Sequence, residues 1–142
     1  MRFSCLREEF IKAISILNDV VPPRSPKPVY QNIRFEGLPD GTLSLSATDL
    51  EIGIRYRLQV EELQDPEVIY LPASRLFGLL KEDWAKTVNF SSTDDQAKLS
   101  LDNRQFSIQA FSGDEFAVGR EIGDQQCFVL NGQDICEAVA KT

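Results

Sequence analysis

The chain has 142 residues, 42% of them hydrophobic and 26% charged, and its 22 acidic and 15 basic residues give a net charge of −7 at neutral pH. This composition is typical of a soluble globular protein, and no apolar run approaches the roughly 20 residues that a membrane-spanning helix needs. The excess of negative charge, taken alone, argues against nucleic acid as a partner. The sequence contains no histidine, the commonest general base and metal ligand, so a catalytic role is less expected.

The chain carries three cysteines, an odd number at wide spacings: Cys5, Cys127 and Cys136. Such a set does not predict a disulfide framework, and the N-terminus shows no apolar segment of the kind that directs secretion. We therefore expect a cytoplasmic protein without a membrane segment, whose cysteines are buried as small apolar side chains.

The N-terminal stretch is predicted to form a strand followed by a helix. Residues 1–6 alternate apolar and polar side chains, as a strand with one buried face does. Over residues 7–21 the apolar side chains fall at helical spacing, and Glu8 and Glu9 lie in the first turn, where acidic groups favour the helix dipole. Pro22 and Pro23 cannot continue a helix, so an exposed linker begins there.

The rest of the chain predicts three strands and then a second copy of the same order. The three strands lie at about 29–36, 42–47 and 52–60, and Asp40-Gly41 predicts a tight turn between the first two because glycine readily adopts positive φ. The second copy has a strand at 68–71, a helix at 72–84 and strands at about 87–91, 97–101 and 104–111. Two such units bury apolar surface best by packing helix beside helix under antiparallel sheets. We therefore expect an α+β fold of two β-α-β-β-β halves with pseudo-two-fold symmetry.

The C-terminal stretch CFVLNGQDICEAVAKT resembles the N-terminus of the chain itself. A shift of 125 positions lays Phe128 over Phe3 and Ala138 over Ala13, again as a strand and an amphipathic helix. Because the second copy stops there, we expect residues 1–125 to form one domain and residues 126–142 to be the first strand and helix of another. The alternative is a C-terminal strand and helix that pack on a single domain.

Several stretches together resemble one protein family. The segments are DGTLSLSATDLEIGI, KPVYQNIRFE, YLPASRLFGLLK and NRQFSIQAF. In order and spacing they are similar to the N-terminal domain of the bacterial sliding clamp, the β subunit of DNA polymerase III. The resemblance implies a non-catalytic processivity factor without cofactor or metal, three tandem domains per subunit, and a head-to-tail homodimer that encircles duplex DNA. It also implies helices that line the hole, sheets outside, and the polymerase and clamp loader as partners.

The resemblance also implies which residues face DNA. The candidates are basic side chains on the two helices and in the proline-rich loop: Lys12, Arg7, Arg24, Arg75 and Lys81. The family often has two adjacent basic residues at the start of the second helix, where this chain has Ser74 and then Arg75, so one contact is expected to be missing. Solvated helix faces are the alternative explanation for these charges, and Lys81 also suits the C-terminal end of a helix dipole.

The resemblance places a subunit interface on the strand RQFSIQAF, through Arg104, Phe106 and Ile108. We expect it to be an edge strand that pairs with the third domain of another subunit. Charged replacements at Phe106 and Ile108 are therefore expected to separate subunits and to leave the fold intact.

Other features are interpreted as structural. Asp49 and Glu51 flank a turn, where aspartate commonly binds its own backbone, and do not predict a metal site. Trp84 is expected to pack beside Leu80 at the end of the second helix. Two other function classes stay open: a stand-alone clamp-like interaction module without DNA binding, and an enzyme, for which no nucleophile–base pair or phosphate loop is found.

Overall fold

The computed structural model describes residues 1–24, 28–49, 51–82 and 84–112. The predicted start of a second domain at residues 126–142, with Cys127 and Cys136, lies outside these residues. Cys5 is buried as expected, and burial raises the pKa of its thiol to about 12.

Each half of the described chain contains the predicted strand, helix and three strands, followed by one further short strand. The first half comprises β1 (Arg2–Leu6), α1 (Arg7–Val20), the 3-10 helix η1 (Pro28–Gln31), β2 (Asn32–Gly37), β3 (Thr42–Thr48), β4 (Gly53–Gln59) and β5 (Glu61–Gln64). The second half comprises β6 (Val68–Pro72), α2 (Ala73–Lys81), β7 (Thr87–Ser92), β8 (Gln96–Leu101), β9 (Arg104–Gln109) and β10 (Phe111–Ser112).

The two halves exchange their first strands. Sheet A has the order β5-β1-β7-β8-β9 and sheet B the order β10-β6-β2-β3-β4, so β1 joins the three strands of the second half and β6 joins those of the first. All pairs are antiparallel, and the registers match apolar side chains, as in Phe3 opposite Phe90 and Phe35 opposite Ile69. The two sheets have equivalent strand orders, so the predicted pseudo-two-fold symmetry is confirmed. The sequence pattern did not predict the exchange.

The chain changes sheet at two equivalent places. Val60 alone separates β4 of sheet B from β5 of sheet A, and Ala110 alone separates β9 of sheet A from β10 of sheet B. Ala110 is buried, and its N–H donates to the Asp95 carbonyl over 2.9 Å. The predicted last strand at 104–111 is therefore two strands in different sheets.

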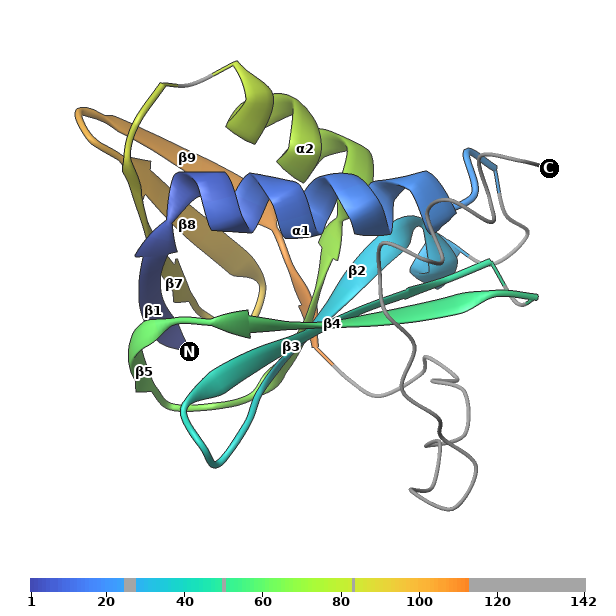
Figure 1. The fold of residues 1–142 in the computed structure, drawn as a ribbon, viewed down its shortest axis with the longest axis horizontal. Coiled ribbons are helices and arrows are strands. Elements are labelled where there is room, and N and C mark those ends of the chain that lie inside the picture. Colours follow the sequence, from blue (N-terminus) through green and yellow to red (C-terminus); the bar gives the residue numbers. More distant parts are fainter. Residues whose placement is uncertain (25–27, 50, 83, 113–142) are drawn as a thin grey trace, which may run out of the picture.

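The core lies where both sheets meet the helices. Figure 1 shows α1 and α2 next to each other on one side of the molecule, with the strands on the other side. Four phenylalanines from β1, α1, β2 and β7 form a continuous cluster, with ring centroids between 4.6 and 6.3 Å apart: Phe3, Phe10, Phe35 and Phe90. Because these rings come from both sheets and a helix, the halves share one core.

Local signals explain most element boundaries. The predicted turn at Asp40-Gly41 is confirmed, since Gly41 has a φ of 84° and the Asp40 carboxylate accepts from the Thr42 N–H over 3.0 Å. The first helix ends at Val20, just before Pro22. The second helix ends at Lys81, three residues earlier than predicted.

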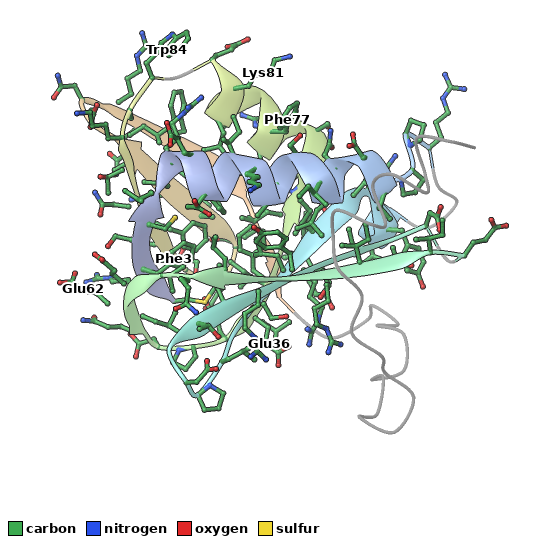
Figure 2. All side chains as sticks on the ribbon, in the orientation of Figure 1. Phe3, Glu36, Glu62, Phe77, Lys81 and Trp84 are labelled. Carbon is green, nitrogen blue, oxygen red and sulfur yellow. The ribbon has the colours of Figure 1, made fainter. Side chains whose placement is uncertain are left out.

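The expectation for Trp84 is wrong. Its side chain lies beyond the end of α2 and is 91% exposed, so it does not pack beside Leu80. Figure 2 shows Trp84 pointing away from the core, at the same end of the molecule as Lys81.

Candidate nucleic-acid interface

The two helices bury one side and expose the other. Phe10, Ala13, Ile14 and Leu17 of α1 and Ala73, Leu76 and Leu80 of α2 are buried. The opposite side of each helix carries exposed polar and charged residues. We call this outward surface of α1 and α2 the helix layer.

Three of the predicted DNA contacts lie exposed on the helix layer: Lys12, Arg75 and Lys81. The ammonium of Lys81 lies 5.7 Å from the centre of the Phe77 ring, a cation–π contact within α2 (Figure 2). Arg24 is also exposed, but it follows the end of α1 and not the helix itself. The structure thus brings three candidates onto one layer and places Arg24 beyond its edge.

Arg7 is engaged within the domain. Its Nε and Nη2 atoms donate to the carbonyl of Leu80 over 3.0 and 2.5 Å, and its backbone N–H donates to the Lys86 carbonyl over 2.9 Å. The last carbonyls of a helix have no partner within the helix, so this guanidinium caps α2. The contact also shows that the start of α1 lies beside the end of α2. A DNA contact by Arg7 stays a prediction.

The helix layer carries both signs of charge. Acidic side chains share it with the three basic candidates and are also exposed: Glu8, Glu9, Asp19 and Glu82. Such a surface attracts phosphate weakly, since each neutralised phosphate contributes to affinity and acidic neighbours offset that gain. The arrangement can contact a nucleic-acid backbone without holding it firmly.

The predicted interface strand, β9, lies at an edge of sheet A, as expected. Arg104 is exposed, Phe106 is partly buried and packs against the core, and Ile108 is only 1% exposed and belongs to the core. The expectation that a charge at Ile108 leaves the fold intact is therefore wrong, because an unpaired charge would be buried there. The interface role of this strand stays a prediction.

The structural interpretation of Asp49 is confirmed. Its carboxylate accepts from the N–H groups of Ile52 over 2.6 Å and Glu51 over 2.9 Å, and these backbone hydrogen bonds hold the pKa of Asp49 below its ordinary value.

Across the described ranges, no three acidic, cysteine or histidine side chains gather as metal ligands would. No helix in the same part of the chain has the length and apolar character to span a membrane.

The fold defines the class of protein. The DNA polymerase III β subunit of Pseudomonas aeruginosa superposes with a TM-score of 0.78 at 24% identity, over 85% of this chain and 33% of that one. The arrangement of sheets and helices is thus that of a clamp domain.

Sequence comparison then identifies the family. Residues 1–119 match the family described as the DNA polymerase III beta subunit, N-terminal domain. The beta sliding clamp of Synechococcus elongatus is 30% identical over 149 aligned positions, which cover 100% of this chain and 38% of the relative. That of Pseudomonas putida is 35% identical over 81 residues, 57% of this chain and 22% of the relative. The chain belongs to the DNA polymerase III β-subunit family and spans well under half the length of these relatives.

The Arg7 contact yields a prediction about stability. Replacing Arg7 with Met should lower the free energy of unfolding by about 1–2 kcal/mol, because the Leu80 carbonyl loses two charge-assisted hydrogen bonds. Urea unfolding of the 142-residue chain measures this. Lys12→Met, an exposed change on the same helix, should stay within about 0.5 kcal/mol of the unaltered chain. Equal, small effects of both changes would show that Arg7 does not cap α2.

Proposed function

We propose that this chain is the first domain of a DNA sliding clamp, a ring that encircles duplex DNA and tethers the replicative polymerase. The observation that carries the proposal is the helix layer: two adjacent helices with exposed outward sides, backed by two sheets, in a chain of this family. In a closed ring, the helix layer would face the DNA and the sheets would form the outer wall.

The proposed hold on DNA is topological. A ring that slides needs only weak contact with the backbone, because strong phosphate binding would slow its movement. The net charge of −7 and the mixed charges of the helix layer suit this requirement. The role requires no chemistry from the domain itself, so we assign it no catalytic residue, cofactor or metal, and we place the protein in the cytoplasm.

Within the ring, we assign the DNA-facing positions to Lys12, Arg75 and Lys81 on the helix layer and to Arg24 at its edge. All four are exposed, and no ion pair is found for any of them within the described residues. Arg7 is the weakest, because its guanidinium already caps α2. Arg24 follows the end of α1, and Arg75 lies in the first turn of α2. The proposed DNA contacts would therefore be spread along both helices.

We further propose that residues 1–125 are one domain of a larger subunit and that residues 126–142 begin the next. The share of the Synechococcus elongatus clamp that the chain covers, 38%, supports a subunit longer than this chain. Two such subunits would join head to tail, with β9, at the edge of sheet A, pairing with the sheet of the partner. The polymerase and the clamp loader would be the protein partners.

The proposed contacts of Lys12 and Arg24 with DNA can be tested by the retention of the ring on circular DNA. In the whole subunit, Lys12→Glu combined with Arg24→Glu should speed loss from nicked circular duplex and lower the slope of salt dependence by about one unit for each residue. Retention after gel filtration at several salt concentrations measures both. Lys98→Glu, which makes the same charge change as either single replacement but on exposed β8 of sheet A, is the control.

Linearising the circle should release the unaltered ring through the ends. Retention on linear DNA equal to that on circles would contradict the ring. If the double variant stays on circular DNA as long as the unaltered protein does, Lys12 and Arg24 do not contact DNA.

The edge strand gives a test of assembly. Phe106→Glu in the whole subunit should yield monomers, because burying an unpaired charge costs several kcal/mol and shifts the dissociation constant by orders of magnitude. Sedimentation velocity measures the change. Gln105→Glu, on the opposite, exposed face of β9, should remain dimeric. A Phe106→Glu variant that remains dimeric would place the interface elsewhere, and Ile108→Glu is expected to unfold the domain.

A further inference from the structure

Sheet A carries a shallow hollow on the face away from the core. The hollow has a volume of about 290 Å³ and crosses four strands, from β5 through β1 and β7 to β8. Neighbouring strands lie about 4.8 Å apart, so the hollow is about 14 Å long. That length accommodates about four residues of an extended chain. We call this hollow the sheet A groove.

The strand register arranges polar side chains along the groove in two rows. The first row contains Gln64, Arg2 and Ser91, and the second contains Ser4, Asn89 and Ser100. Within the described residues, no side-chain hydrogen bond or ion pair is found for any member of either row. The two phenylalanines that also border the groove, Phe3 and Phe90, are each only 3% exposed. The groove therefore offers hydrogen-bonding groups and almost no aromatic surface.

A β-bulge in β5 shapes one end of the groove. Arg2 pairs with Gln64 and Ser4 pairs with Glu61, so β5 has one more residue than β1 between these two pairs. Glu62 lies in this bulge with a φ of 55°, in the left-handed region that side chains other than glycine rarely adopt. Bulges commonly redirect a side chain beside a functional site. Here Glu62 points away from the core and borders the groove (Figure 2).

The groove has one positive and one negative side chain, on different rows. Arg2 belongs to the first row, and Glu62 lies at the end of the second row, beside Ser4. No ion pair is found for either charge in the part of the chain that the structure describes. Glu62 would repel the phosphates of a nucleic-acid strand, and the bases would find no aromatic ring to stack on. The chemistry of the groove therefore favours a peptide.

An extended peptide matches both rows. Its consecutive side chains point to opposite sides, so an acidic residue facing Arg2 places the next residue toward Glu62. Each residue of its backbone also carries a donor and an acceptor. The side-chain amides of Gln64 and Asn89 and the serine hydroxyls can both donate and accept, so they can pair with that backbone.

We propose that the sheet A groove is a docking site for an extended segment of a partner protein in which acidic and basic residues alternate. An acidic side chain of the segment binds Arg2, and the basic side chain next to it binds Glu62. Gln64 and Asn89 bind the backbone of the segment. The site lies on the outer face of sheet A, so it requires neither DNA nor a closed ring.

A synthetic peptide tests the groove in the 142-residue chain. The probe is an acetylated and amidated peptide of alternating glutamate and lysine, about eight residues long, or twice the length of the groove. In an NMR titration it should shift the side-chain NH2 signals of Gln64 and Asn89. Arg2→Gln should weaken binding about tenfold, because a charge-assisted hydrogen bond is lost, and Glu62→Gln should do the same.

Lys98→Gln is the matched control for Arg2→Gln. Lys98 lies opposite Ser91 on the same face of sheet A but does not line the groove, so this change should leave the dissociation constant unaltered. Equal weakening by Lys98→Gln and Arg2→Gln would show general attraction of charge and overturn the proposal. So would a titration that shifts neither NH2 signal, or tighter binding of single-stranded oligothymidylate than of the peptide at these two signals.

Discussion

The exchange of first strands between the two halves is the constraint on which the rest of the structure depends. β1 completes sheet A with strands of the second half, and β6 completes sheet B with strands of the first. Each five-stranded sheet therefore contains strands of both halves. The phenylalanine cluster packs across this exchange, with rings from both sheets and from α1 in contact. Since each helix directly follows an exchanged strand, the exchange also brings α1 and α2 together on one side.

This arrangement gives the domain three surfaces with different properties. The helix layer is exposed and carries both signs of charge, and Arg7 fastens the start of α1 to the end of α2. The outer face of sheet A is solvated, with exposed residues alternating along β7 and β8. In sheet B, by contrast, all seven residues of β3 are buried.

Local sequence signals predicted where the helices and strands lie along the chain better than they predicted which strands lie side by side. Helical spacing located α1, and the turn chemistry of Asp40-Gly41 and Asp49 was correct because those side chains bind their own backbone. Alternation shows which side chains share a face of a strand, but it does not show which strand lies beside it, so the exchange was missed. For the same reason, Phe106 and Ile108 were correctly placed on one face, but the burial of Ile108 was not foreseen. The early end of α2, which exposes Trp84, was also not predicted.

The central claim is that the helix layer, and not the sheets, faces DNA. A photo-activated crosslinker placed at residue 12 of α1, or at residue 98 of β8, tests this in the whole clamp subunit loaded onto circular duplex DNA. Both positions are exposed and carry lysine, so the two differ mainly in the surface they occupy. The account predicts crosslinks to DNA from residue 12 and none above background from residue 98. Equal crosslinking from both positions, or crosslinking from residue 98 alone, would contradict it.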